Sequence, residues 1–172
     1  MRQFPNEAPT PQAATLHEVI RYYVNENERR AAESAAGLTP DEVNSDPGHG
    51  AWGIGQLVKH QNDLVGMVTE TLKPGSTKDL ALPDVGTTGD WNLENLMAAR
   101  RQLTERFFEV FESVTPEDLM GVQPEAYPPR WAEWPILMRI LRPILDIATH
   151  IGQVNYARRQ LGNPVGSSGA KR

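Results

Sequence analysis

Four long stretches in which apolar residues recur at intervals of three and four constrain this chain most. This spacing is that of an amphipathic helix. The stretches cover about residues 13–36, 52–73, 90–114 and 134–161, and Pro, Gly and Asp are frequent between them. We find no convincing strand pattern. The sequence therefore predicts an all-α fold, a four-helix bundle whose long inter-helix connections leave room for a crossover.

Residues that start and stop helices mark several of the ends. Gly37 is a natural stop after the first stretch. Asp90 or Asn92 can cap the third by accepting a hydrogen bond from a free N–H group. Pro135 suits the first position of the fourth, where a missing N–H costs nothing. The fourth stretch is apolar almost all round, which predicts the most buried helix, and Pro143 within it should kink or break that helix.

Two short segments that follow the first and third helices resemble each other. Each has Thr-Pro followed by two acidic residues, at Thr39-Pro40 and at Thr115-Pro116. A residue before proline is disfavoured in the helical region, so each Thr marks a helix end. The acidic pair suits the first turn of a new, short helix. Ordinary turn chemistry and an internal duplication both explain the pattern.

Length and composition limit the class of protein. The 172 residues fit one domain: a flexible N-terminal segment (1–12), the bundle (13–162) and a disordered Gly/Ser-rich tail (163–172). The chain has no Cys, which excludes disulfides, Cys-ligated metal sites and a thiol nucleophile of its own. A net charge of −5 argues against a nucleic-acid partner. No signal peptide and no run of 18 apolar residues is present, so we expect a cytoplasmic protein without a membrane partner.

The histidines supply the candidate site residues. His60 lies three residues after Leu57 and four before Leu64, on the apolar face of the second helix. Asp146 and His150 are four residues apart on the fourth helix. Both therefore lie on one face, one turn apart, which suits chelation of a single ion.

Simpler explanations exist for each feature alone. A hydrogen-bonded core histidine is the commoner explanation of His60, and an intrahelical Asp–His hydrogen bond explains the pair on the fourth helix. Against the second, an unpaired carboxylate in apolar surroundings is costly. Two imidazoles and one carboxylate suit Zn²⁺, Ni²⁺ or Fe²⁺ and leave coordination positions open. We therefore predict a divalent-metal site of His60, Asp146 and His150 in the bundle interior.

Two motifs carry a resemblance to a known family. Trp-Gly-Ile-Gly-Gln-Leu-Val-Lys-His at residues 52–60 resembles the second-helix signature of the DinB-like (DinB/YfiT) superfamily. His-Ile-Gly-Gln-Val at residues 150–154, leading to Arg-Arg-Gln-Leu-Gly at residues 158–162, resembles the signature of its last helix. The resemblance covers about residues 13–162. It implies a four-helix bundle, often a homodimer, with a divalent metal held by one side chain of the second helix and two of the last.

The resemblance also implies site residues and chemistry. His60 and His150 match the usual ligand positions, and Asp146 stands where many members have a second histidine. The similar mycothiol-dependent maleylpyruvate isomerases have Glu in the corresponding place. Thiol-cofactor chemistry is therefore implied, such as transfer or isomerisation with mycothiol or bacillithiol as co-substrate. The absence of Cys is compatible with a thiol supplied from outside.

Three hypotheses of function remain open at this point. The favoured one is a metal-dependent enzyme, a hydrolase or a thiol-dependent transferase or isomerase, acting on a small-molecule substrate. The second is a non-catalytic bundle that binds a metal or small molecule. The third is an oligomeric protein with a vestigial site. Beyond the three ligands, no catalytic or cofactor-binding residue is identified.

Other residues are weaker candidates. His49, in a glycine-containing loop, is expected to cap or to lie exposed near the site entrance, and His17 to lie at the surface or boundary of the bundle. Trp131 and Trp134 are expected to pack the bundle end. The loop between Asp84 and Asp90 matches no ligand-binding loop.

Two arginine pairs could hold an anionic substrate. Solvated helix faces are nevertheless the favoured explanation of both pairs, Arg100-Arg101 and Arg158-Arg159.

Overall fold

Six helices make up the fold of the described residues. The computed structural model describes residues 15–82, 90–122 and 131–166. The helices are α1 (Leu16–Ala35), α2 (Pro40–Val43), α3 (Ile54–Leu72), α4 (Leu93–Phe111), α5 (Pro116–Met120) and α6 (Ile136–Gln160). These residues form no strand beyond one isolated bridge, between Val122 and Pro135. The four long helices form a bundle, so the predicted all-α class is confirmed.

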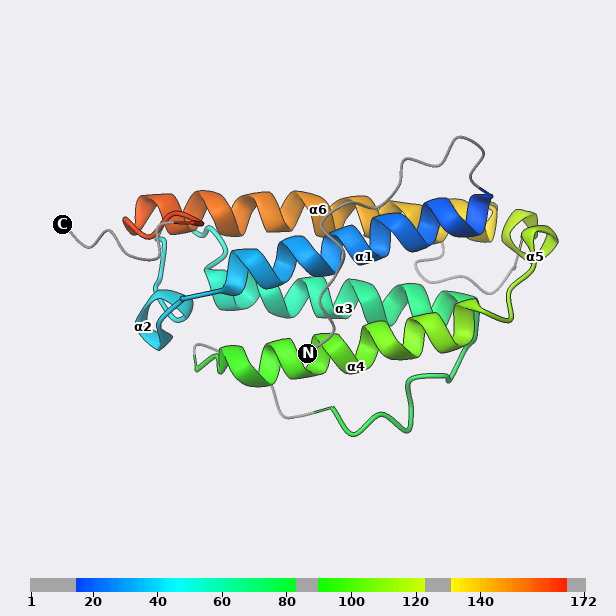
Figure 1. Ribbon diagram of the computed structural model, residues 1–172, viewed down its shortest axis with the longest axis horizontal. Coiled ribbons are helices and arrows are strands. Elements are labelled where there is room, and N and C mark those ends of the chain that lie inside the picture. The colour runs from blue at the N-terminus through cyan, green and yellow to red at the C-terminus, as the bar shows by residue number, and fades with distance from the viewer. Residues whose placement is uncertain (1–14, 83–89, 123–130, 167–172) are drawn as a thin grey trace.

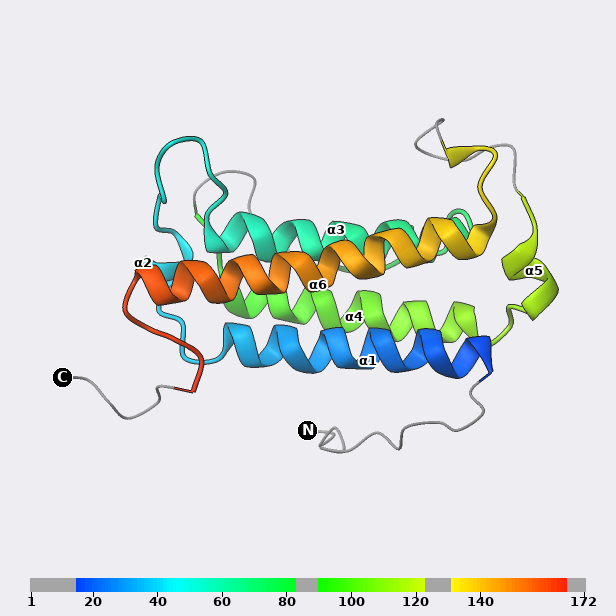
Figure 2. The ribbon, with the colours of Figure 1, turned by 90° about the horizontal axis from the view of Figure 1, so that it is seen from above.

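The long helices are not arranged in a simple up-down order. In Figure 1, α1 and α6 run in one direction, and α3 and α4 run in the other. α3 packs against both α4 and α6, and α1 packs against α6 (Figure 2). Because α3 and α4 are parallel neighbours, the chain between them must return along the bundle, and the described residues 73–82 begin that return. The crossover connection that the sequence predicted as possible is therefore present, between α3 and α4.

Side-chain caps explain where the long helices begin and end. Thr15 and Glu18 form a reciprocal capping box at the start of α1. The Asn92 side chain accepts a hydrogen bond from the backbone N–H of Asn95, at 2.9 Å, and caps α4 as predicted. Gly37, just beyond α1, has a positive φ of 73°, which glycine adopts at little steric cost.

The two short helices follow the repeated Thr-Pro motif. Thr39 caps α2 and Thr115 caps α5, each through a capping box with an acidic residue three positions later. α2 lies at one end of the bundle and α5 at the other (Figure 1). Val43 and Leu119, at equivalent positions of the motif, are both buried in the core. The short helices predicted from this motif are therefore confirmed.

The most buried helix is α3, and the prediction that it would be the last helix is wrong. Ten of the 19 residues of α3 are buried, against nine of the 25 in α6. α3 packs extensively against both α4 and α6, whereas α6 packs less extensively against α1 and leaves Met138 and Leu145 exposed on its outer face. α6 also continues through Pro143, so the proline causes no break. Among the described helices, none combines the length and apolar character needed to cross a bilayer.

Candidate metal centre

His60 and His150 face each other between α3 and α6. Their ring centroids are 4.9 Å apart, and the rings are nearly perpendicular, at 80°. Both side chains are partly buried. The two helices pack side by side over much of their length, which brings together residues 90 positions apart in the sequence. Two imidazoles from different helices thus share one location near the surface of the bundle.

The hydrogen bond of His150 defines which of its ring nitrogens is free. Nδ1 of His150 lies 2.8 Å from Oε1 of Gln153, one turn further along α6. An amide oxygen only accepts hydrogen bonds, so Nδ1 carries the hydrogen and donates it. The lone pair is then on Nε2, which has no hydrogen-bond partner among the described residues. In metal sites, a bond of this kind fixes the ligating histidine in one tautomer and orientation.

Trp52 adds a third ring to this pair. Its indole contacts the His60 ring edge-on, at 4.9 Å between centroids, and stacks on His150 at 5.9 Å and 28°. Helical periodicity does not identify Trp52 as a site residue, although the family motif begins with it. Trp52 lies in the loop before α3, and its place beside His150 depends on how that loop folds against α6.

Asp146 lies one turn before His150 but is engaged elsewhere. Its Oδ2 is 3.3 Å from Nε of Arg142, in an ion pair that is partly exposed to solvent. Within the described parts of the chain, no three His, Asp or Glu side chains are arranged as a metal-binding group. The two histidine rings are therefore adjacent, whereas Asp146 is turned toward Arg142.

The surroundings favour the neutral form of His60. Burial lowers its pKa below the ordinary value of a histidine, and the neighbouring His150 lowers it further. Asp63 and Asp146 act in the opposite direction without cancelling the effect. A neutral imidazole is the form that ligates metals, so the site favours the ligand-competent state.

The other two histidines have structural or solvent-exposed positions. Nε2 of His17 lies 2.5 Å from the carbonyl oxygen of Val114, to which it donates, and the ring stacks on Phe111. His49 is exposed in the loop before α3 and has a positive φ of 54°.

The remaining residues predicted from the sequence do not contribute to this site among the described residues. Trp131 and Trp134 stack on each other at the start of α6, away from the histidine pair. Asp84 lies outside the described residues, and Asp90 is exposed just before α4.

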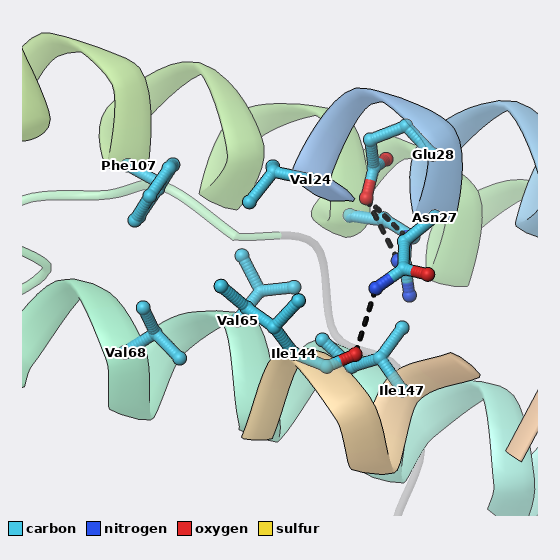
Figure 3. Close-up of a pocket in the computed structure, with 9 residues that line it drawn as sticks. Val24, Asn27, Glu28, Val65, Val68, Phe107, Ile144 and Ile147 are labelled. Carbon is cyan, nitrogen blue, oxygen red and sulfur yellow. Dashed lines mark hydrogen bonds and ion pairs between the residues drawn. The ribbon is translucent and has the colours of Figure 1, made fainter. Parts of the chain in front are cut away.

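Arg100 is buried, so its assignment to a solvated helix face is wrong. Its side chain is 1 % exposed and forms an ion pair with Glu28 of α1, with Nη2 and Oε1 2.7 Å apart. Nη1 also donates to Oε1 of Gln61 on α3, at 3.1 Å. Figure 3 shows Glu28 directed inward from α1 toward this position. The guanidinium connects α1, α3 and α4, so it is not available to hold a substrate. The neighbouring Arg101 is exposed, as predicted.

Arg158 is also buried, contrary to the sequence prediction. Its Nη1 donates to the carbonyl oxygens of Ser34 and Ala36, at 2.7 and 2.8 Å, and so satisfies the end of α1. Its Nε donates to the carbonyl oxygen of Asn163 at 2.9 Å. Burial lowers the pKa of Arg158, which remains charged at neutral pH. Arg159, the other member of this pair, is exposed.

Two hollows in the described structure do not coincide with the histidine pair. A cavity of about 20 Å³ lies between the four long helices, with walls that include Val65, Val68 and Ile147 (Figure 3). It has room for little more than one water molecule. A cleft of about 260 Å³ lies at the end of the bundle near α5, beside Lys73 and Asp118. The carboxylate of Asp118 accepts the capping hydrogen bonds of α5.

Fold and site together define a helical bundle with paired, partly exposed imidazoles between its third and sixth helices. The family model of the DinB superfamily matches residues 23–154, and this chain belongs to that superfamily. The chain is also similar to a solved structure of a conserved protein from Enterococcus faecalis. The two are 20 % identical, with a TM-score of 0.61 over 86 % of this chain and 97 % of the other, so they share the fold. No curated protein matches the chain.

Proposed function

We propose that this protein binds one divalent metal ion through His60, His150 and Asp146 and acts as a metal-dependent enzyme on a small molecule. The observation that carries the proposal is the pair of imidazoles from α3 and α6 with ring centroids 4.9 Å apart. Metal sites in helix bundles are commonly built from side chains on facing helices, as His60 and His150 are.

The donor atoms present fit a divalent ion. His60 and Nε2 of His150 have no hydrogen-bond partner among the described residues, so their ring nitrogens are available to a ligand. Free ring nitrogens of two neighbouring histidines favour Zn²⁺, Ni²⁺ or Fe²⁺ over Mg²⁺ or Ca²⁺, which prefer oxygen ligands.

Asp146 is the third proposed ligand and must first leave Arg142. The ion pair between them is partly exposed, and such pairs contribute only about 0–1 kcal/mol. Asp146 is one helical turn from His150, on the same face of α6. Little free energy is therefore lost when Asp146 leaves the guanidinium of Arg142 to bind a metal ion.

The chemistry follows from the ion and the chain's own residues. A bound ion supplies a Lewis acid that activates a water or thiol or polarises a carbonyl. His60 and His150 hold it, and Gln153 keeps His150 in the tautomer that exposes Nε2. Because the chain has no Cys, any thiol must come from a cofactor such as mycothiol or bacillithiol. That cofactor and the homodimer stay predictions.

Metal analysis of tag-free protein tests the proposal. After exposure to Zn²⁺, Ni²⁺ or Fe²⁺ and removal of excess metal, we expect about one ion per chain. His150→Ala should lose the ion and Asp146→Ala should weaken its binding, both with the fold retained. Asp79→Ala, at an exposed position beyond the C-terminal end of α3, is the matched control and should keep it. Absence of any ion in the wild-type protein would overturn the proposal.

Turnover separates an enzyme from a metal-binding protein. With a low-molecular-weight thiol and an electrophile offered to the metal-loaded protein, we expect turnover that His60→Ala abolishes without unfolding the chain. A full complement of metal without turnover would favour the non-catalytic bundle.

A further inference from the structure

The third ring of the site, Trp52, is unusually exposed for its size. Tryptophan is a large apolar residue that usually buries most of its surface. Trp52 is 48 % exposed, yet its ring contacts both proposed ligand histidines. One part of the indole therefore lies against the imidazoles, and the rest is open to solvent beside them.

The backbone around Trp52 holds it in this position. The following residue, Gly53, is the N-cap of α3, and a Cβ atom there would lie 2.9 Å from the carbonyl oxygen of Ser45. A Cβ atom on Gly55 would lie 2.3 Å from the ring of Trp91. Both glycines thus permit close packing that a larger residue would prevent. These two close approaches fix the backbone at the start of α3, directly after Trp52.

The loop that leads into Trp52 is also defined by its backbone. Three successive residues, Gly48, His49 and Gly50, have φ values of 73°, 54° and 72°. The N–H of Gly48 donates to Oδ1 of Asp46, and the N–H of Ala51 to the carbonyl oxygen of Gly48. The indole is therefore presented by a structured turn rather than by a free loop.

We propose that Trp52 is the specificity-determining residue of this site and selects ligands with a flat, conjugated or aromatic group next to their metal-binding atoms. The inference rests on the proposed function, because the ion would hold the polar end of the ligand. The exposed indole offers the π-surface on which the flat group stacks, as aromatic pairs do at centroid distances of about 4.5–7 Å. Binding sites of this type combine an aromatic wall with a few polar groups.

Two hydroxamates that differ in one group test this inference. Acetohydroxamate and benzohydroxamate chelate a metal ion through the same two oxygens, but only the second carries an aromatic ring. Their dissociation constants are measured by calorimetry on the metal-loaded protein, with metal content determined in parallel. The wild-type protein should prefer benzohydroxamate. Trp52→Ala should reduce that preference by about 2- to 10-fold, the size expected for one aromatic pair.

Further variants make the test specific. Trp52→Phe keeps a ring and should keep part of the preference. Trp134→Ala removes another tryptophan with an exposed surface, which stacks on Trp131 at the start of α6, and should leave the preference unchanged. A preference that survives Trp52→Ala in metal-loaded protein would overturn this inference and leave the metal site standing. Absence of bound metal in the wild-type protein would overturn the proposed function and this inference with it.

Discussion

Two groups of polar side chains between the helices of this bundle differ in whether they have hydrogen-bond and ion-pair partners. Between α1, α3 and α4, Arg100 is buried and its guanidinium is paired with Glu28 and Gln61. Between α3 and α6, His60 and His150 are partly exposed and leave ring nitrogens without partners among the described residues. The first arrangement uses its charges to join helices. The second leaves its donor atoms available, which is what a binding site requires.

The contrast suggests a practical distinction for bundles of this kind. Buried charges whose partners come from other helices indicate a structural role, since removing one partner leaves the other unpaired. Polar groups at a helix contact that lack partners and reach solvent indicate a functional role.

Arg100→Ala should destabilise the protein more than any other change considered. It leaves the carboxylate of Glu28, whose side chain is 11 % exposed, without its cation. We expect a loss of about 3–5 kcal/mol in the free energy of unfolding, measured by urea denaturation. Arg101→Ala, at the exposed neighbouring position, should change it by less than about 0.5 kcal/mol. Equal effects of the two changes would contradict the structural role of the buried pair.

Gln153→Ala should weaken metal binding without destabilising the fold. Its Oε1 orients the His150 ring, and loss of such a supporting bond typically costs about 10–100-fold in metal affinity. Gln153→Glu should bind metal at least as tightly as wild type, because a carboxylate supports a ligating histidine even better. Gln160→Ala, exposed at the end of the same helix, is the control. A Gln153→Ala protein with wild-type affinity would contradict the orienting role.

Arg142→Ala should strengthen metal binding. It removes the cation that holds Asp146, so the carboxylate no longer has to leave an ion pair to reach the metal. The expected gain is up to about 5-fold, which corresponds to the roughly 1 kcal/mol that an exposed pair contributes. Arg159→Ala removes an exposed charge from the same helix and serves as the control for net charge. A weaker affinity in Arg142→Ala than in Arg159→Ala would argue against Asp146 as a ligand.

Glu42→Gln should produce the smallest effect, and its size should depend on pH. A hydrogen bond from the Thr39 backbone lowers the pKa of Glu42, and bonding to Asn163 contributes to the shift. A carboxyl whose pKa is lower in the folded protein stabilises it above the ordinary value near 4.5, and this contribution is lost as pH falls through the folded pKa.

The measurement is the free energy of unfolding of both proteins between pH 7 and pH 3. Glu42→Gln should be less stable than wild type by up to about 1 kcal/mol at pH 7, and the difference should decrease as the pH falls below the ordinary carboxyl pKa near 4.5. A difference that stays constant with pH would show that the charge of Glu42 makes no contribution.

Local signals in the sequence predicted much of the fold. The apolar periodicity located all four long helices, and Asn92, Gly37 and the two Thr-Pro motifs marked ends that the structure confirms. These features depend on a few neighbouring residues. The relative burial of α3 and α6 depends on how much of each helix its neighbours cover in the bundle, and periodicity alone does not supply that information.

The same limit applies to the candidate site. Helical spacing and the family motifs singled out His60 and His150, and the structure brings their rings together. Trp52 was missed because a loop, not a helical repeat, carries it to His150. Arg100 and Arg158 were misassigned because a buried arginine looks like a solvated one in the sequence when its partners lie on other helices.

Anomalous diffraction from crystals grown with Zn²⁺, measured on both sides of the zinc absorption edge, tests the proposed metal site most directly. We expect one strong anomalous peak between α3 and α6, within about 2.0–2.1 Å of a ring nitrogen of His60 and Nε2 of His150. Asp146 should have turned from Arg142 toward the ion. No peak at the histidine pair, or a peak held by other residues alone, would show that His60 and His150 do not form a metal site.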